Sequence, residues 1–567
     1  MPAVRWIFTT RWCVLVGLLA SFEVDAVTTK ATVYLKSGDQ NSDDFPKFTV
    51  KVGIEDMDGI AVGVLHHGVN SSGWDKVKIH GLANTDASTT AMAMGFLEGY
   101  LTQPSIFAVS QNNYADWFVN AAKRSPTPVE DWLVQNYDWM KKSASVKRFS
   151  AVRSEATYWT QVHFLLSQFQ GLMLGYNAAA DPEQSLPLNL FLLLNSDGDV
   201  ESIINLPSIV AKYRSLNQTQ FRPKKDLRCS AIFKYDRVAR EMYFGHSTWD
   251  NFDMGGIRQL KRYVYNLKGY SKVEISMSST PGFLSSVDDF FLTSLGLAVV
   301  ETTNGNRNPV LWEKVSIKSV LSWARSMAAN ILASTTKAWS STFCMENSGT
   351  YNNQWMILDL NKFQTFQNDR AMKYMENDTF RVLEQLPGSC TVGDMTGHIE
   401  AEGYWASYNI PFFENVWKSS GFDKLRPKVD YSHSTSARAQ IFATRQATVK
   451  DLNSLKAILR YNDYTNDPVA HGDPCRAISA RCDLNPVTAP NFRLEGGMDA
   501  KATTASVAYS NLQFAAQNGP THDSSLPPFN WSQWVHRFPF PGYEQVPLHV
   551  GSPDVFDFDW VDFKPEL

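Results

Sequence analysis

The chain has 567 residues, of which 44% are hydrophobic and 19% charged, a composition typical of a globular protein rather than a disordered one. Lysine and arginine (53) nearly balance aspartate and glutamate (57), no long basic run is present, and we therefore expect no nucleic-acid partner. The length predicts two to four domains, or one large α/β unit with insertions.

Residues 1–26 have the pattern of a signal peptide. Arg5 and Arg11 precede a short apolar stretch at 12–20, and the small residues Val24 and Ala26 predict cleavage after Ala26. A retained signal anchor is the alternative. No later window reaches 18 unbroken apolar residues, so we expect no transmembrane segment in the mature protein.

Four Asn-x-Ser/Thr sequons follow this segment, at Asn70, Asn217, Asn377 and Asn530. Such sequons accept N-linked glycans on proteins that pass through the secretory route. Together with the signal peptide they predict a glycoprotein that is secreted or lysosomal.

Residues 27–228 alternate between strand and helix patterns. Short apolar runs predict strands at 31–35 and 61–65, and helices are predicted at 91–100, 129–141 and 155–175. The polar segment 215–228 has no apolar periodicity and ends in Pro-Lys-Lys-Asp-Leu-Arg, which indicates an exposed linker open to proteolysis.

Residues 229–567 begin with a predicted hairpin, formed by runs at 229–234 and 241–246 that place Cys229 at its open end. A helix is predicted at 249–267, then strands at 273–277, 290–294, 297–303 and 354–360. Further helices are predicted at 319–333 and 448–460, the second with Thr448 and Asp451 as a capping pair. Hairpins and helices come in blocks without steady βαβ alternation, which favours an α+β layered fold with a largely antiparallel sheet.

Removal of Cys13 with the signal leaves five cysteines, an odd number for an oxidising compartment. Cys475 and Cys482 are close enough in sequence to form a small disulfide, Cys344 and Cys390 are a possible second pair, and Cys229 would then be free. A spare cysteine is often buried and inert. If the Arg228–Cys229 bond is cut, however, Cys229 carries both a thiol nucleophile and an α-amine that can act as its base, and no metal is needed.

Several long motifs resemble the phospholipase B-like family, and the match runs from about residue 50 to 560. The matching segments are 229–232, 245–249, 301–306, 347–355, 404–411 and 477–481. The resemblance implies an N-terminal nucleophile hydrolase with a four-layer αββα fold, in which two antiparallel sheets stack between helices. It also implies cleavage into a light chain (27–228) and a large chain (229–567) that remain associated.

The resemblance further implies a hydrolase that removes fatty acids from glycerophospholipids without a cofactor. Two alternatives stay open: an amidase acting on N-acyl or peptide-like substrates, and a lipid-binding glycoprotein with little turnover.

Around Cys229, the resemblance places His246 and Trp249 near the nucleophile, although both could be core residues. Asn352 and Asn353 precede a predicted strand, where a side-chain amide could donate to a tetrahedral oxyanion or simply form a turn. Substrate contacts are expected from Thr302, Thr303 and Arg481, and Arg481 could instead pair with a structural acid.

Overall fold

The computed structural model describes residues 27–36, 46–118, 126–216, 229–535, 537 and 547–564. The predicted signal peptide (1–26), Asn217, Arg228 and most of the predicted linker lie outside the described residues. Within the described part of the chain, no helix is both long enough and apolar enough to cross a membrane.

The larger of two main sheets has, among the described residues, eleven strands in the order β13-β12-β11-β10-β9-β8-β7-β4-β3-β1-β2. Neighbouring strands are antiparallel except for β4 and β7, which run parallel. The strands are β1 (Thr28–Leu35), β2 (Phe48–Val52), β3 (Ala61–His66), β4 (Trp74–Gly81), β7 (Arg258–Tyr265), β8 (Val273–Ser279), β9 (Phe290–Thr293), β10 (Leu297–Thr303), β11 (Asn353–Asp359), β12 (Phe380–Leu386) and β13 (Ser389–Asp394).

The smaller sheet is antiparallel and contains the predicted hairpin, which is confirmed. Its order is β14 (Tyr404–Ser407), β5 (Ser230–Asp236), β6 (Glu241–Asn251), β15 (Glu495–Thr504), β16 (Phe514–Asn518) and β19 (Val561–Phe563). Ala231 on β5 faces His246 on β6 across the hairpin. A separate two-stranded ribbon joins β17 (Phe529–Asn530) to β18 (Val555–Phe556).

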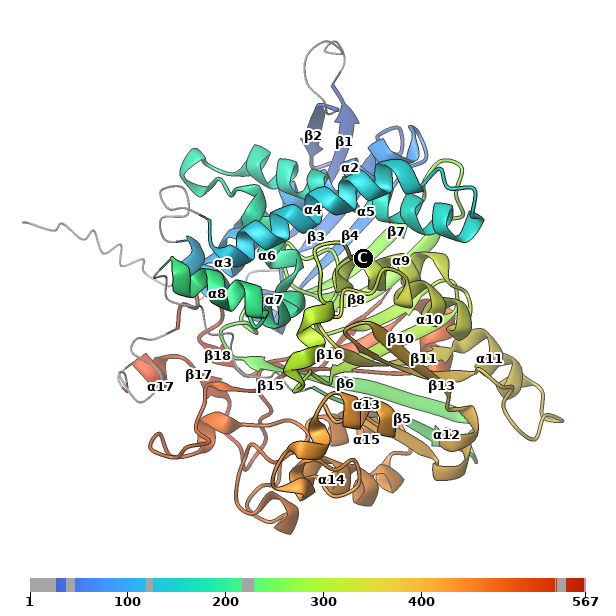
Figure 1. Ribbon diagram of the computed structural model, residues 1–567, viewed down its shortest axis with the longest axis vertical. Helices are drawn as coiled ribbons and strands as arrows, with labels where there is room; N and C mark the ends of the chain where they lie inside the picture. Colours follow the sequence, from blue (N-terminus) through green and yellow to red (C-terminus); the bar gives the residue numbers. More distant parts are fainter. Residues whose placement is uncertain are drawn as a thin grey trace, which may run out of the picture.

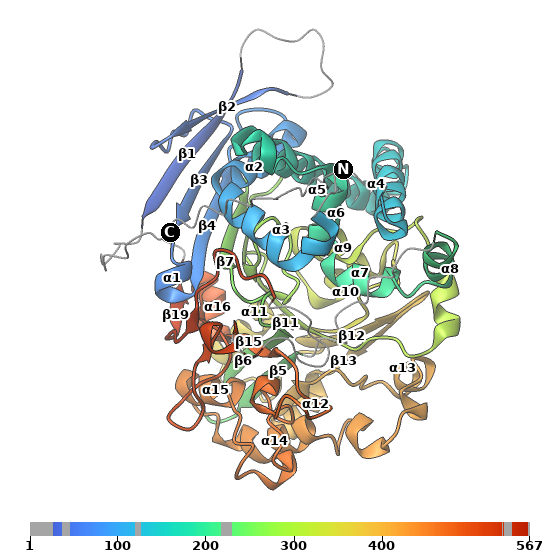
Figure 2. The ribbon, with the colours of Figure 1, turned by 90° about the vertical axis from the view of Figure 1, so that its left-hand side faces the viewer.

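The two sheets stack on each other, and helices cover their outer faces (Figures 1 and 2). Aromatic side chains fill the space between the sheets: Phe233 and Phe244 stack with ring centroids 5.0 Å apart, and Phe290 lies beyond them. Helices α14 and α15 pack below the smaller sheet, whereas α2, α5 and α9 pack above the larger one. The α+β class with stacked sheets is therefore confirmed.

Most helices precede β5 or follow β10 in the chain. Their bounds are α1 (Val69–Ser72), α2 (Ala87–Leu101), α3 (Gln103–Phe118), α4 (Pro128–Lys147), α5 (Arg153–Ala179), α6 (Leu188–Asn195), α7 (Asp197–Ile203), α8 (Pro207–Ser215), α9 (Ser322–Leu332), α10 (Thr336–Cys344), α11 (Leu360–Asn368), α12 (Thr396–Glu402), α13 (Glu414–Ser419), α14 (Ala437–Arg445), α15 (Leu452–Leu459), α16 (Ala505–Asn511) and α17 (Ser532–Val535).

Helices α2 and α5 approach each other closely because glycines lie at their contact. A Cβ added at Gly95 would lie 1.9 Å from the carbonyl oxygen of Gln168, and one at Gly171 would lie 1.9 Å from that of Met92. Even alanine is too large at these positions, so the pair packs backbone to backbone.

The predicted helix at 249–267 is wrong, because this segment ends β6, turns, and forms β7. Every residue of β7 is buried, including Arg258, Lys261 and Arg262. Lys261 Nζ lies 2.7 Å from a carboxylate oxygen of Glu98 on α2, and Arg262 pairs with Glu274 on β8. The buried charged residues of β7 have partners that are distant in the sequence, and they interrupt the alternating apolar pattern by which strands are recognised.

The predicted cap of the helix at 448–460 also needs correction. Helix α15 begins later, at Leu452, and its capping box is formed by Asp451 and Ser454, whose side chains each accept a hydrogen bond from the other's backbone N–H. The Thr448 hydroxyl donates instead to the carbonyl of Arg445, inside the preceding turn.

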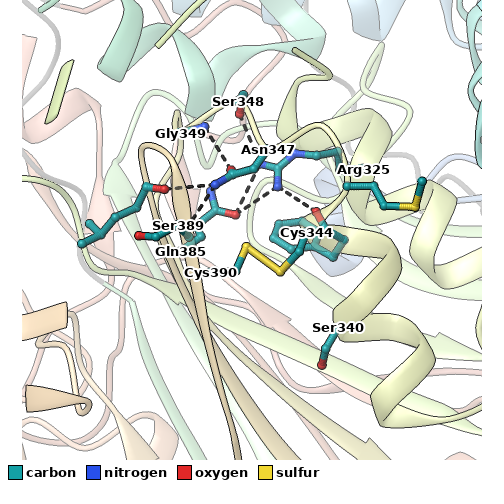
Figure 3. Close-up of a disulfide and its surroundings, with 12 residues drawn as sticks. Arg325, Ser340, Cys344, Asn347, Ser348, Gly349, Gln385, Ser389 and Cys390 are labelled. Carbon is teal, nitrogen blue, oxygen red and sulfur yellow. Dashed lines mark hydrogen bonds between the residues drawn. A yellow bond between two sulfur atoms is a disulfide. The ribbon is translucent and has the colours of Figure 1, made fainter. Parts of the chain in front are cut away.

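Both predicted disulfides are present, and Cys229 is free. Figure 3 shows the Cys344–Cys390 bridge, which ties the end of α10 to the edge strand β13. Nearby, Asn347 donates to the carbonyls of Leu386 and Ser389, so hydrogen bonds reinforce the same junction.

Candidate functional site

Cys229 directly precedes β5, inside the smaller sheet between β14 and β6. Its side chain is 5% exposed and lines a cavity between the two sheets' ends. Arg438 on α14 donates to the Cys229 carbonyl at 2.6 Å, and the Ser230 hydroxyl donates to the carbonyl of Ile478 at 3.0 Å. The backbone that carries the thiol is therefore held from two sides.

The cavity beside Cys229 is mostly apolar and has a volume of about 90 Å³. Its apolar lining comes from Val200, Trp249, Met254, Phe283, Val287 and Met498. An adjoining cavity of about 350 Å³ is more polar and is lined by Asn304, Asn306, Arg307, Trp312, Asn352 and Asn409. Gly198, Glu201, Thr303 and Tyr351 line both cavities, so the two are neighbours.

His246 and Glu301 lie beside the thiol. One donor atom from each, and the sulfur of Cys229, all lie within 4.8 Å of one another. His246 is fully buried, and its Nδ1 lies 3.1 Å from the Thr248 hydroxyl. Burial lowers the pKa of His246 well below its usual range, with a further contribution from nearby Lys501, so the ring is neutral.

The environment of Cys229 favours the protonated thiol in this state. Burial raises the pKa of Cys229 well above its usual value, and the Glu301 carboxylate raises it further. The backbone N–H of Trp249 and the ammonium of Lys501 act in the opposite direction. A base placed beside the sulfur is therefore needed to generate the thiolate.

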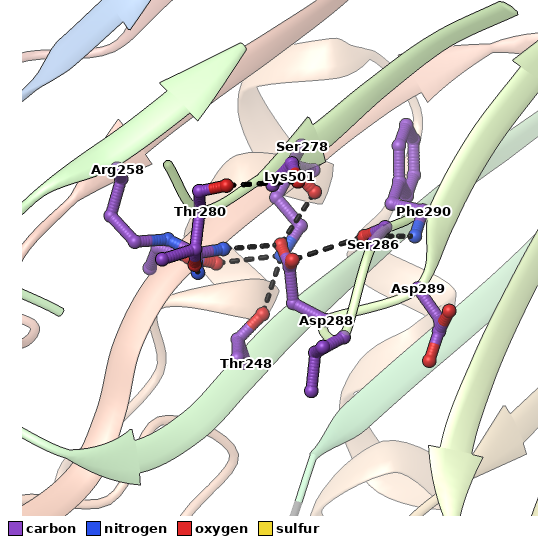
Figure 4. Close-up of polar contacts among 12 residues, drawn as sticks. Thr248, Arg258, Ser278, Thr280, Ser286, Asp288, Asp289, Phe290 and Lys501 are labelled. Atoms are coloured by element: carbon purple, nitrogen blue, oxygen red, sulfur yellow. Dashed lines mark hydrogen bonds and ion pairs between the residues drawn. The ribbon is translucent and has the colours of Figure 1, made fainter. Parts of the chain in front are cut away.

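A buried ion network surrounds Asp288, next to the cavity (Figure 4). Asp288 accepts a hydrogen bond from Lys501 at 2.8 Å and forms an ion pair with Arg258 at 2.6 Å, and both cations also contact Asp499. The two cations hold the pKa of Asp288 well below its usual range despite its burial. Lys501 also donates to Thr248, which contacts His246, so the network reaches the imidazole.

Asp289 and Glu301 form a second acidic group. The Tyr351 hydroxyl lies 2.8 Å from Asp289 and 3.1 Å from Glu301, and it also contacts the carbonyl of Val287. Burial raises the pKa of both carboxyls, and the nearby Asp289 raises that of Glu301 further, whereas hydrogen bonds from Tyr351 act in the opposite direction. The two carboxyls lie close enough for each to affect the titration of the other.

The predicted site residues do not all lie beside Cys229. Trp249 lines the Cys229 cavity, and its indole N–H donates to the carbonyl of Ile478 at 2.8 Å. Asn352 lines the adjoining polar cavity, where its amide donates to the Gly349 carbonyl. Asn353 begins β11 opposite Thr303, and neither polar atom of its buried side chain has a partner among the described residues.

The three predicted substrate-contact residues separate in the same way. Thr303 lines both cavities, whereas the Thr302 hydroxyl bonds to Ser407 at 2.6 Å between the sheets. Arg481 is buried and makes two 2.9 Å contacts with Asp483, with further bonds to the carbonyls of Thr521 and Pro527. This bidentate pairing supports the structural alternative for Arg481.

Three predicted glycosylation sites lie in the described residues. Asn70 and Asn377 are exposed, on α1 and in the turn before β12. Asn530 on β17 is only partly exposed, and its side-chain oxygen is buried without a partner among the described residues. Asn70 and Asn377 are therefore more accessible to glycan transfer than Asn530.

Sequence reasoning missed the ion network of Arg258, Asp288 and Lys501. These residues come from β7, the β8–β9 connection and β15, so no local spacing links them. Glu301 and Tyr351 lie within the matching segments 301–306 and 347–355, but the sequence predicts no role for them. The alternation of Asp499 and Lys501 on one strand was the single local signal for a buried pair.

The chain is similar in sequence to the proteins of one family. A family model described as Phospholipase B matches residues 61–563. "Phospholipase B-like protein B" of Dictyostelium discoideum is 35% identical over 527 residues, covering 91% of this chain and 87% of the relative. "Phospholipase B-like 1" of Rattus norvegicus is 35% identical over 522 residues (90% and 89% covered), and that of Homo sapiens is 33% identical over 529 residues (92% and 90%).

Proposed function

This chain belongs to the phospholipase B family, and from that premise we propose that it is an acyl hydrolase whose nucleophile is Cys229. We propose that cleavage of the Arg228–Cys229 bond converts the chain into light (27–228) and large (229–567) chains with an N-terminal nucleophile hydrolase fold. The substrate class is a glycerophospholipid, and the protein acts as a secreted or lysosomal glycoprotein. No cofactor takes part.

The observation that carries this proposal is the position of the free thiol. Among the described cysteines, Cys229 is the one outside the two disulfides. It directly precedes the inner strand β5 and lines a mostly apolar cavity. An apolar cavity suits an acyl chain, and the neighbouring polar cavity suits a head group.

The reaction would proceed through a thioester. The α-amine released at Cys229 accepts the thiol proton, and the sulfur attacks the acyl carbonyl. The ester C–O bond breaks, and the leaving alcohol takes the proton from the ammonium. Water then attacks the thioester, the C–S bond breaks, and the fatty acid leaves while the sulfur regains a proton.

His246 and Trp249 would position the sulfur through their contacts beside it, whereas Asn352 and Asn353 would serve as candidate donors to the oxyanion. Asn353 is the better candidate of the two because its amide is uncommitted, although a side-chain rotation is needed to bring it to the cavity. Thr303, which lines both cavities, would contact substrate.

The cavity beside Cys229 holds about 90 Å³, whereas small-molecule sites usually measure roughly 300–1,000 Å³. We propose that a lipid occupies this apolar cavity together with the adjoining polar cavity of about 350 Å³.

The test compares Cys229→Ala, Cys229→Ser and Asn353→Ala with the natural chain, because substitution of the nucleophile separates cutting from turnover. Cys229→Ala should remain a single chain and release no fatty acid from a diacyl phospholipid. Cys229→Ser should be cut slowly and lose most hydrolysis, since a serine hydroxyl is the weaker nucleophile. Asn353→Ala should be cut and lose roughly 10²-fold in turnover.

The controls distinguish the alternatives. Arg481→Lys, away from the cavities, should leave processing intact if the protein folds. Cutting of Cys229→Ala at the same bond would show that an external protease acts. Faster turnover of a matched N-acyl amide would replace the lipid with an amide substrate, and full activity with the thiol alkylated would reject the cysteine mechanism.

A further inference from the structure

The second use of the Cys229 site concerns metal ions. Sulfur, imidazole nitrogen and carboxylate oxygen, all from buried side chains, lie within 4.8 Å of one another at Cys229, His246 and Glu301. These three donors come from three places in the fold: the start of β5, the middle of β6 and β10 of the other sheet. The two stacked sheets therefore bring the donors together.

Two polar atoms of these side chains, Nε2 of His246 and Oε2 of Glu301, are buried without a hydrogen-bond partner among the described residues. A buried polar atom without a partner costs about 1–3 kcal/mol, so a ligand that contacts both atoms would remove that cost. Their shared neighbour is the free thiol of Cys229.

We propose that Cys229, His246 and Glu301 bind a thiophilic divalent ion of the Zn²⁺ type, and that the ion reversibly blocks the nucleophile. The blocking effect rests on the proposed function of Cys229, whereas ion binding does not. The ion is an inhibitor in this proposal and takes no part in turnover.

The donor set matches the chemistry of Zn²⁺. Thiolate, neutral imidazole and carboxylate are the side chains that Zn²⁺ uses, at about 2.3, 2.0–2.1 and 2.0–2.2 Å. Tetrahedral coordination at those lengths needs about 3.5 Å between donors. The present donor atoms lie within 4.8 Å of one another, so binding requires the three side chains to move closer together.

Charge and proton balance also permit binding. Binding of the ion displaces the thiol proton of Cys229 to solvent, and the thiolate and the Glu301 carboxylate then neutralise the dication. The neighbouring cations Lys501 and Arg258 are already paired with Asp288 and Asp499. In the cut protein, the α-amine of Cys229 would add a fourth donor in a five-membered chelate with its own sulfur.

Cobalt(II) titration of the purified uncut chain tests the site without reference to activity. We expect a near-ultraviolet band from sulfur-to-cobalt charge transfer at one ion per chain, and competition by Zn²⁺ should remove it. Cys229→Ser should lose the band, and His246→Asn and Glu301→Gln should weaken binding. His163→Asn, which changes a half-buried histidine bonded to Ser88 on α2, should bind as the natural chain does.

A second measurement uses only the natural chain, so it does not depend on whether the variants fold. Zn²⁺ should protect Cys229 in the natural chain from alkylation, and a chelator should restore the alkylation rate. Absence of the charge-transfer band, or a band unchanged in Cys229→Ser, would overturn the proposed site. If saturating Zn²⁺ leaves the rate of fatty-acid release by the cut protein unchanged, the blocking role is wrong. If the cut protein releases no fatty acid even without metal, the proposed function fails, while cobalt binding still decides the site.

Discussion

At the scale of single residues, Arg438 connects the nucleophile to its surroundings. Its guanidinium donates to the carbonyls of Cys229 and Tyr408 at 2.6 and 2.7 Å and lies 4.6 Å from the centroid of the Trp249 ring. A lysine has one point charge and no planar fork, so it cannot replace these contacts together. Arg438 thus positions the backbone of Cys229 and lines neither of the two cavities.

Arg438→Lys should slow both chain cutting and acyl release by roughly 10- to 100-fold, because small displacements of a nucleophile are costly. Gel densitometry over time and a fatty-acid release assay measure the two rates. Arg445→Lys is the matched control, since Arg445 lies on the same helix α14 and packs on Tyr461 instead. Equal loss in both variants would mean that α14, rather than Arg438, is being disturbed.

Glu384 on β12 gives a pH prediction. Burial raises the pKa of Glu384 from 4.5 to about 7, opposed by hydrogen bonds from Phe412, Gln354, Phe413 and Asn304. Because the folded pKa exceeds the unfolded one, the folded state binds the proton more tightly between pH 4.5 and 7. Stability contributed by this proton is present below pH 4.5 and is lost as pH rises through 7.

The free energy of unfolding of the natural chain should therefore fall by about 3 kcal/mol more between pH 4.5 and 7 than that of Glu384→Gln. Urea unfolding at several pH values measures both slopes, and comparing slopes removes any constant cost of the substitution. Identical slopes would show that Glu384 is ionised at low pH in the folded protein.

The proximity of Cys229, His246 and Trp249 could be predicted from the sequence, because one local hairpin carries all three. Their roles in catalysis stay predictions. The proximity of Arg258, Asp288 and Lys501 could not be predicted, since their association depends on three strands meeting in space. Arg481 shows the reverse: a recognised motif contains a residue that pairs with Asp483 away from the cavities.

At the scale of elements, β7 depends on a buried ion pair with α2. Lys261 donates to Glu98 at 2.7 Å and to the carbonyl of Phe283, and the Tyr263 hydroxyl donates to the same carboxylate at 2.6 Å. Burial lowers the pKa of Lys261, which Glu98 opposes. The contact with Glu98 therefore counteracts the effect of burial on the Lys261 ammonium.

Glu98→Gln should destabilise the protein by roughly 3–5 kcal/mol, because an ammonium is then buried without its counterion. Adding Lys261→Met should recover most of that loss, since methionine fills a similar volume without charge. Denaturant unfolding of the two single variants and the double variant gives the coupling. Additive losses in the double variant would contradict a direct interaction.

Helices were easier to predict than β7 for a physical reason. α4 buries one recurring face, which leaves a period of 3.6 residues in the sequence, whereas α2 and α5 are buried on most sides and are recognised as long apolar runs. β7 is buried on both faces and carries three charged residues whose partners lie on α2, β8 and the β8–β9 connection. A rule that reads one segment at a time has no access to those partners.

At the scale of the whole molecule, strands from both sides of residue 228 share one sheet. β1 to β4 precede that residue, β7 to β13 follow it, and the two groups meet where β4 runs parallel to β7. The sequence predicted the α+β class and the hairpin. It did not predict this junction, because parallel pairing between distant strands leaves no turn or spacing in the chain.

Cut protein should therefore remain one particle. We expect light and large chains to co-elute in gel filtration at neutral pH and to separate only in denaturant. Separate elution of the chains in native buffer would contradict a shared sheet core.

Substituting Gly171→Ala in the α2–α5 contact should lower the unfolding temperature, since a Cβ there would meet the carbonyl of Met92.

The junction of β4 and β7 also sets the molecularity of folding. Before cutting, both halves of the sheet belong to one chain, and their pairing is a first-order reaction. After cutting, the same pairing joins two molecules, so the unfolding midpoint should rise with protein concentration and refolding should become second order. The mature protein would thus be maintained by slow unfolding rather than by ready refolding, and its lifetime would depend on having been assembled once as a single chain.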